Sequence, residues 1–308
     1  MNATAKTPIV HEVTPKRGVR TPSPVILVAT DGSETSIAAY AAAELIAGEL
    51  HARVHGLSVL EPLPTILPPP GTPVLATGVD KSREEALRID MVEQLLKLGK
   101  LAKWSTEIRL GKPPSVIAEV AKERNVDLVI VGASRHGVVD RLFREETATQ
   151  LARRIERPLL VASPLIARLP KRVVIALDLS FADRSSFVTV LDMVGSPHSV
   201  SILHVVPRSE ALGVDWAEYD HEYRAEVERT FFRLNEKLAA LPHMQSDLVV
   251  MHGDAAREIN DFAQNVKAEL IVLGVKRRGA FSIAPGGGIA MRVLRAAKCS
   301  VLLVPSNA

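Results

Sequence analysis

Val126-Asp-Leu-Val-Ile-Val-Gly132 and Ala268-Glu-Leu-Ile-Val-Leu-Gly274 are two versions of one pattern, and they stand 142 residues apart. The residues before them repeat at the same offset, with Arg109-Leu-Gly111 in the first position and Met251-His-Gly253 in the second. Self-similarity at a fixed period indicates repeated structural units. The chain is therefore two copies of one unit.

Two further pairs of segments extend the repeat towards both ends of each copy. Val25-Ile-Leu-Val-Ala-Thr-Asp31-Gly-Ser33 recurs as Val173-Val-Ile-Ala-Leu-Asp178-Leu-Ser180, and Arg157-Pro-Leu-Leu-Val-Ala-Ser163 recurs as Cys299-Ser-Val-Leu-Leu-Val-Pro305. The aspartates of the first pair are 147 residues apart, which makes the first copy five residues longer. The extra length falls where the proline-rich stretch Glu61–Gly71 is typical of a surface loop.

Within each copy, short runs of Val, Ile and Leu alternate with longer segments of helical period, which is typical of βαβ units with a parallel sheet. Strands are predicted at 25–30, 53–59, 105–110, 127–132 and 158–162, and again at 172–177, 199–206, 246–251, 269–274 and 300–304. Helices are predicted at 34–50, 83–102, 114–124 and 146–156, and again at 181–194, 216–240, 255–267 and 288–297. We expect two tandem α/β domains at residues 23–166 and 170–308, after a flexible basic leader at 1–22.

Composition excludes several classes of protein. The 38 Lys and Arg against 35 Asp and Glu leave a net charge of +3, and the first twenty residues alone account for it. Only 4% of residues are aromatic, so neither a basic surface nor stacking residues favour nucleic acid as a partner. No apolar stretch is long enough to cross a bilayer. The single Cys299 excludes an internal disulfide, and we expect a cytoplasmic protein in which this thiol is buried.

The spacing of residues in this sequence does not match the catalytic and metal-binding motifs that it partly resembles. Gly132-Ala-Ser134-Arg-His136 lacks the second glycine of a nucleophile elbow, and Val138-Val139 replaces the Lys-Ser/Thr pair of a phosphate loop. His221-Glu222 is followed by Ala225 where a zinc helix needs a second histidine. We expect no catalytic residue and no metal ligand.

The ends of the predicted strands indicate a binding crevice instead. First strands end at Asp31 and Asp178, and fourth strands end at Gly132 and Gly274. In an open doubly wound sheet, ligands bind beyond the carboxyl ends of strands where the chain order reverses. Each aspartate could equally serve only its own turn or helix start, where Asp is favoured in any case.

Together these segments resemble the universal stress protein family, in its tandem two-domain form, from residue 23 to 306. The resemblance implies open parallel sheets of strand order 3-2-1-4-5, Rossmann-like, in two domains related by pseudo-twofold symmetry. It also implies antiparallel pairing of the fifth strands, Leu159 to Ala162 and Val301 to Val304. Some members bind ATP, and those carry Gly-x2-Gly-x9-Gly-Ser/Thr after the fourth strand.

In the first copy this motif is degenerate beside Asp31. Gly132 fits, but Arg135 replaces the second glycine, and Glu145-Glu146 replaces the closing Gly-Ser/Thr. Carboxylates at a helix start compete for the donors that would hold a phosphate and repel the anion. We expect the glutamates to cap their own helix, with Arg135 as ion-pair partner.

The second copy is closer to the motif. Gly274 fits, Arg277 replaces the second glycine, and Gly286-Gly287-Gly288 precedes the helix that starts at Ile289. By family analogy, the candidate nucleotide-binding residues are Asp178, His204, Val205, Val206, Leu273, Gly274, Gly286, Gly287, Gly288 and Ile289. Arg277 and Arg278 are further candidates because they supply positive charge nearby. The glycines could instead form a hinge, and the Arg277 side chain could fill the crevice itself.

The resemblance implies a ligand-responsive stress or regulatory module, with ATP, and Mg²⁺ if ATP is bound, or another phosphate-bearing ligand in the second domain. An interaction scaffold that binds no nucleotide but an unknown protein partner is the alternative, because both copies carry arginine at the second glycine. An apolar or lipid-like ligand between sheet and helices is a third hypothesis. We expect at most weak ATP hydrolysis, and pairing of the domains within the chain leaves a homodimer open.

Overall fold

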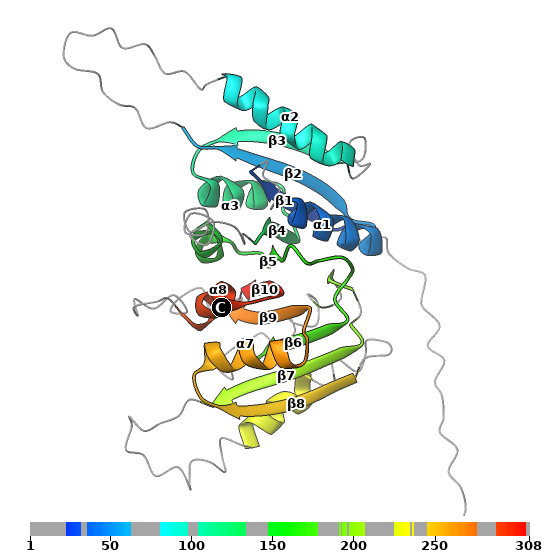
Figure 1. Cartoon of the computed structure of the whole chain (residues 1–308), viewed down its shortest axis with the longest axis vertical. Helices are drawn as coiled ribbons and strands as arrows, with labels where there is room; N and C mark the ends of the chain where they lie inside the picture. The colour runs from blue at the N-terminus through cyan, green and yellow to red at the C-terminus, as the bar shows by residue number, and fades with distance from the viewer. Residues whose placement is uncertain are drawn as a thin grey trace, which may run out of the picture.

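The computed structural model describes residues 23–31, 36–62, 81–97, 104–133, 147–177, 191, 193–195, 197–206, 225–234, 236, 245–275 and 288–305 (Figure 1). Among these residues, no helix is both long enough and apolar enough to cross a membrane. The predicted leader at 1–22 and most of the proline-rich stretch lie outside the described residues.

All the predicted strands are confirmed, with ends that differ from the prediction by no more than one residue. They are β1 (Val25–Thr30), β2 (Arg53–Leu60), β3 (Ser105–Leu110), β4 (Leu128–Gly132), β5 (Leu159–Ala162), β6 (Arg172–Ala176), β7 (Ser199–Val206), β8 (Gln245–His252), β9 (Leu270–Val275) and β10 (Ser300–Pro305). The helices with defined bounds are α1 (Ile37–Leu50), α2 (Lys81–Lys97), α3 (Pro113–Glu123), α7 (Ala255–Asn265) and α8 (Ile289–Ala296). Residues 147–154 and 225–234 are also helical.

The strands form one continuous ten-stranded sheet in the order β3-β2-β1-β4-β5-β10-β9-β6-β7-β8. Each half has the predicted order 3-2-1-4-5, and pairing within each half is parallel. The halves meet where β5 and β10 pair antiparallel, with Leu160 opposite Leu302. Figure 1 shows this seam in the middle, with β3 and β8 at the two outer edges. The antiparallel pairing of the fifth strands is therefore confirmed.

The inner strands of the sheet are buried on both faces, which explains why they are almost continuously apolar, whereas the edge strands β3 and β8 are partly exposed. Along β1, Ile26 and Val28 belong to the core on one face, and Leu27 and Ala29 belong to the core on the other. The first core includes buried residues of α1, and the second includes buried residues of α3, α7 and α8. The repeat in the sequence is thus a repeat of sheet and covering helices.

Two glycines show how closely the halves repeat each other. Gly111 after β3 and Gly253 after β8 have φ angles of +139° and +156°, which side chains rarely adopt. A Cβ at Gly111 would lie 2.8 Å from Val116, and a Cβ at Gly253 would lie 2.6 Å from a Glu258 oxygen. Both positions therefore need glycine for the tight turn from an edge strand into its helix.

Candidate functional site

The strand order reverses once in each half, and these two switch points are where a ligand would bind. In the first half the reversal lies between β1 and β4, where Ala29 is opposite Val131. In the second half it lies between β6 and β9, where Ala176 is opposite Leu273. The carboxyl ends of these strands define what we name the first crevice and the second crevice.

The first crevice is a cavity of about 600 Å³, a volume within the range of small-molecule sites. Asp31, at the end of β1, and Gly132, at the end of β4, both line it, as the sequence predicts for neighbouring strands. Residues of α2, the start of α3 and residues 147–148 complete the wall. Two residues from distant parts of the sequence therefore meet in one crevice.

The charges of the first crevice disfavour an anion. Among its described lining residues, Asp31, Glu61 and Asp90 are acidic and Arg83 is the basic one. The Arg83 guanidinium donates to the backbone carbonyl of Glu61 at 3.4 Å. A triphosphate would add negative charge beside three carboxylates, and like charges at short range repel. The described part of this crevice is therefore poorly suited to phosphate, in line with its degenerate motif.

A buried polar cluster fixes α2 against the inner wall of the first crevice. The Thr30 hydroxyl donates to the Ser36 hydroxyl at 2.7 Å, and Gln94 of α2 lies within 3.5 Å of both. The Ser58 hydroxyl donates to the Thr30 carbonyl at 3.0 Å. Buried polar groups need such partners, so this cluster sets where α2 packs. Gln94 was not among the predicted site residues.

The second crevice is described only in part. His204 of β7 is buried, and its Nδ1 lies 2.9 Å from the Leu177 carbonyl oxygen. A carbonyl can only accept, so Nδ1 carries the proton and donates. Val205 is half-buried, and Val206 and Leu273 are buried. These residues serve the core at least as much as the crevice.

The start of α8 follows the glycine run that the sequence assigns to the second crevice. Gly288 is the N-cap, with φ −66° and ψ 170°, and a glycine has no side chain with which to cap the helix. The N–H groups of Met291 and Arg292 bond to the Gly288 carbonyl, and the first helical residue, Ile289, is exposed. Uncapped N–H groups and the helix dipole favour an anion at such an end. Gly274, at the neighbouring end of β9, is half-buried.

Arg292 of α8 is already neutralised by a carboxylate. Its guanidinium lies 2.6 Å from Asp254, which also accepts from the Arg257 backbone N–H at 3.0 Å and caps α7. The Arg292 hydrogen bond, followed by the Arg257 N–H, holds the pKa of Asp254 below its usual value. Positive charge for a bound anion would therefore come from elsewhere in this half.

Several predicted site residues lie outside the described residues. They are Asp178, Arg277, Arg278, Gly286 and Gly287 in the second copy, and Arg135, Glu145 and Glu146 in the first. Their roles remain predictions from the sequence.

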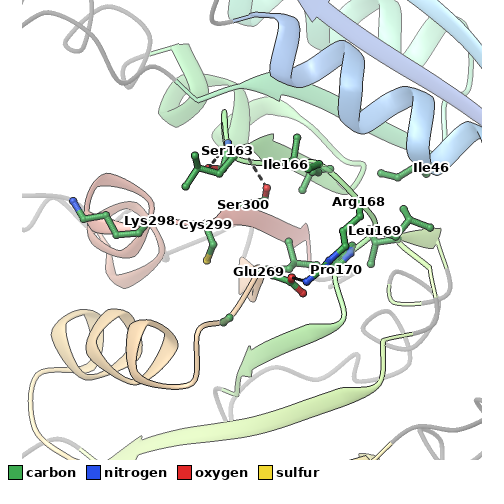
Figure 2. A pocket seen from close by; sticks show the side chains of 16 residues that line it. Ile46, Ser163, Ile166, Arg168, Leu169, Pro170, Glu269, Lys298, Cys299 and Ser300 are labelled. Carbon is green, nitrogen blue, oxygen red and sulfur yellow. Dashed lines mark hydrogen bonds and ion pairs between the residues drawn. The ribbon is translucent and has the colours of Figure 1, made fainter.

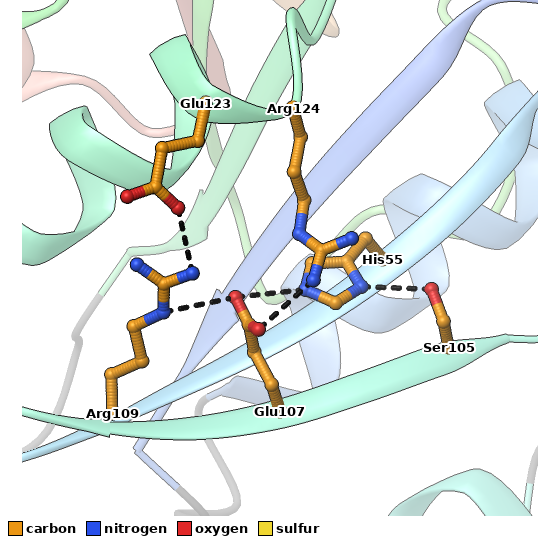
Figure 3. Close-up of polar contacts among 6 residues, drawn as sticks. All are labelled: His55, Ser105, Glu107, Arg109, Glu123 and Arg124. Carbon is orange, nitrogen blue, oxygen red and sulfur yellow. Dashed lines mark hydrogen bonds and ion pairs between the residues drawn. The ribbon is translucent and has the colours of Figure 1, made fainter.

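A second polar cluster, on β2 and β3, was missed by sequence reasoning. The buried His55 lies with Nδ1 2.8 Å from the Ser105 hydroxyl and Nε2 3.2 Å from Glu107 Oε1. Glu107 is also paired with Arg109 at 3.3 Å and with Arg124 at 2.9 Å (Figure 3). A signal was available, because the alternation Ser105-Thr-Glu107-Ile-Arg109 places three polar residues on one face of a strand.

This cluster has the residue types of a hydrolytic triad, but its contacts are those of a structural ion-pair network. His55 Nε2 and Glu107 Oε1 are within ion-pair distance, yet they do not meet hydrogen-bond geometry. The lining of the first crevice does not include Ser105, His55 or Glu107. Arg124 follows α3 directly, so the ion pairs join edge strand β3 to β2 and α3.

We expect acid to reduce the contribution of this ion-pair network to the stability of the fold. Burial lowers the pKa of His55, and Glu107 opposes that shift only in part, while the two arginines add to it. His55 therefore binds a proton less readily in the folded protein than in the unfolded chain. Its contribution to the free energy of unfolding is complete above about pH 6.5 and is lost as the pH falls below that value. His55→Gln should flatten the dependence of the free energy of unfolding on pH between about 7.5 and 5.5.

Urea melts at each pH measure this effect, with His252→Gln as the control for replacing an exposed histidine by glutamine. Burial alone would raise the pKa of Glu107, but the Arg124 hydrogen bond and the adjacent His55 lower it on balance, so the contribution of Glu107 to stability is lost only in more acidic solution. An unchanged slope in His55→Gln would contradict the assignment to His55.

Cys299 corrects one expectation. The sequence predicts a buried thiol, but Cys299 is half-buried and precedes β10 by one residue, where it lines two cavities. The apolar run that suggested burial begins one residue later, at Ser300. The thiol is therefore closer to solvent than its neighbours in the strand.

The strand order and its two switch points define a tandem, doubly wound α/β protein. A family model for the universal stress protein family matches residues 24–163 and again 170–305. The chain belongs to the universal stress protein family, with two family domains in tandem.

Comparisons with individual proteins also find universal stress proteins. A universal stress protein of Methanocaldococcus jannaschii is 30% identical over 141 residues, which cover 44% of this chain and 79% of that protein. The crystal structure of a universal stress protein from Archaeoglobus fulgidus covers 92% of this chain and 97% of its own, with a TM-score of 0.61 at 16% identity. A Pseudomonas aeruginosa protein described as functionally unknown covers 92% and 93%, with a TM-score of 0.59 at 18% identity. At such identities the two structures establish the fold alone.

Proposed function

We propose that this chain is a ligand-responsive stress or regulatory module that binds ATP or another phosphate-bearing ligand in the second crevice. The observation that carries the proposal is the start of α8, where Gly288 leaves the first backbone N–H groups of the helix without a side-chain cap. A helix start at a switch point is a common site for phosphate. The glycine run Gly286–Gly288 adds support from the sequence, since glycine lets a ligand approach the backbone closely.

The contrast between the two crevices also supports this choice. Three carboxylates line the described part of the first crevice, against one guanidinium. In the second copy, Lys276, Arg277 and Arg278 follow β9 in the sequence. A phosphate is attracted by the second set of charges and repelled by the first. We therefore expect one phosphate-bearing ligand per chain.

We expect at most weak ATP hydrolysis from the proposed module. Mg²⁺ would accompany the phosphates if ATP is the ligand. In this proposal the second crevice binds the ligand, and ligand binding alters the surface that a partner protein contacts.

Gly287→Glu tests the proposed site by adding to the second copy the carboxylate that Glu145 supplies in the first. We expect ATP to bind at least about tenfold more weakly, because one added negative charge beside a phosphate readily opposes binding by ~1.4 kcal/mol. Isothermal titration calorimetry with Mg²⁺ present measures the change.

The matched control for that variant is Gly48→Glu, which adds the same charge on α1 at a position with open space around it. Native mass spectrometry of gently purified protein gives an independent reading, with one adenine nucleotide per chain expected. Unweakened binding in Gly287→Glu would show that the phosphate lies elsewhere.

A scaffold that binds no nucleotide is the second candidate function. It is favoured by Arg135 and Arg277, which occupy the second-glycine position of the motif in the two copies. Protein that is purified empty, and whose melting temperature ATP leaves unchanged with or without Mg²⁺, would support the scaffold over the nucleotide-binding module.

A further inference from the structure

A separate cavity lies at the seam between the two halves, away from both crevices. Its volume is about 350 Å³, and its lining comes from both halves and from the segment that joins them. Ile46 of α1 and Leu160 of β5 line it from the first half, and Val194 and Leu270 from the second. Residues 165–170 of the joining segment complete its wall. We call it the junction cavity.

The walls of the junction cavity are mainly apolar. Ile46, Leu160, Val194 and Leu270 are buried core residues, and Leu165 of the joining segment is 70% exposed although it lines the cavity. An exposed leucine beside an apolar hollow loses contact with water when a ligand fills the hollow. Cavities of this size at domain junctions are preferred places for small molecules.

Ser300 gives the junction cavity a buried hydroxyl group. Ser300 is 3% exposed, and its Oγ accepts the backbone N–H of Ser163 at 3.0 Å. A hydroxyl also has one hydrogen to donate, and among the described residues no acceptor is found for that of Ser300. Figure 2 shows Ser300 in the middle of the labelled lining residues. The cavity therefore offers one hydrogen-bond donor to an occupant.

The charged residues that line the junction cavity do not favour a charged ligand, because Arg168 and Glu269 pair with each other. Arg168 and Glu269 are paired at 2.7 Å, and Glu269 also accepts from the backbone N–H groups of Lys171 and Arg172. Burial alone would raise the pKa of Glu269, but these hydrogen bonds lower it on balance, so it stays ionised and paired. In Figure 2 the Lys298 side chain points away from the other labelled side chains. The positive charge of Arg168 and the negative charge of Glu269 therefore balance each other in the wall of the junction cavity.

We propose that the junction cavity binds a small, uncharged and mainly apolar molecule that carries one hydrogen-bond acceptor, which receives the Ser300 hydroxyl. The occupant contacts both halves and the joining segment, so its binding stabilises their packing at the seam. This site is independent of the nucleotide proposal, since the cavity shares none of its lining with the candidate nucleotide residues.

Acetophenone is a suitable probe, because it is uncharged, has an apolar ring and carries one carbonyl acceptor. We expect ligand-observed NMR titration of the full chain to give a roughly millimolar dissociation constant, as for other fragments of this size. Isopropenylbenzene has the same shape without the acceptor and should bind about fivefold more weakly. Ser300→Ala should remove that difference between the two probes.

Ala167→Phe blocks the cavity from an exposed position, so folding is preserved while acetophenone binding is lost. Ala86→Phe is the matched control, because Ala86 is also exposed but lines the first crevice, and binding should persist. Cys299 lines the junction cavity and is the single cysteine of the chain, so bound acetophenone should slow its reaction with a disulfide reagent.

Three results would overturn the proposal: no binding of acetophenone to the full chain, binding that survives Ala167→Phe, or benzoate binding more tightly than acetophenone. The last result would assign the cavity to an anion. None of these results depends on whether ATP binds in the second crevice.

Discussion

Leu302→Ala should lower the free energy of unfolding by about 2–5 kcal/mol, the usual range for a fully buried leucine. Leu302 has no exposed surface, and it lies opposite Leu160 at the seam where β5 and β10 pair. Its core contains residues of both halves, so the cavity left by the substitution weakens the packing of each half against the other. Urea unfolding followed by circular dichroism measures the loss.

Leu165→Ala is the control for this prediction, because it removes the same atoms from a side chain that is 70% exposed. We expect it to change the free energy of unfolding by less than about 0.5 kcal/mol. Equal losses in the two variants would mean that the seam contributes no more to stability than the surface does.

Tyr40→Ala should cost about 3–5 kcal/mol, as for other large aromatic side chains in a core. Tyr40 of α1 is fully buried and stacks on Trp104 with ring centroids 5.6 Å apart. Burial raises the pKa of its hydroxyl to about 12, so the ring stays neutral across the range in which the protein is handled. Thermal and urea unfolding of the purified variant measure the loss.

Tyr40→Phe separates the ring from the hydroxyl. The Tyr40 oxygen is buried and has no partner in good hydrogen-bond geometry among the described residues, so deleting it removes little. We expect a change of less than about 1 kcal/mol in either direction. A loss in Tyr40→Phe as large as that in Tyr40→Ala would show that the hydroxyl, and not ring packing, holds α1 in place.

The sequence predicts the inner strands of the sheet well because they are buried on both faces. Runs such as Leu128–Gly132 and Leu270–Val275 can satisfy their apolar side chains only inside a covered parallel sheet, so composition decides their structure locally. The order of the strands followed from the family resemblance, and so did the antiparallel pairing at Leu160 and Leu302.

The lining of the first crevice could be predicted only in part. Asp31 and Gly132 end neighbouring strands, so their meeting follows from topology. Asp90 and Arg83 reach the crevice because α2 docks there through the buried Gln94, and no local pattern fixes where a helix docks. The junction cavity around Ser300 likewise depends on how two halves pack, which periodicity within either half does not describe.

The β5–β10 seam has a consequence for how the two crevices can differ. A symmetric dimer of identical chains must present the same residues at both of its sites, so any change in one site occurs in the other. Here a single chain supplies both sides of the seam, and the two crevices are encoded by separate stretches of sequence. Glu145-Glu146 can therefore stand in one copy while Gly287-Gly288 stands in the other. The crevice residues of one half can therefore change without the same change in the other half.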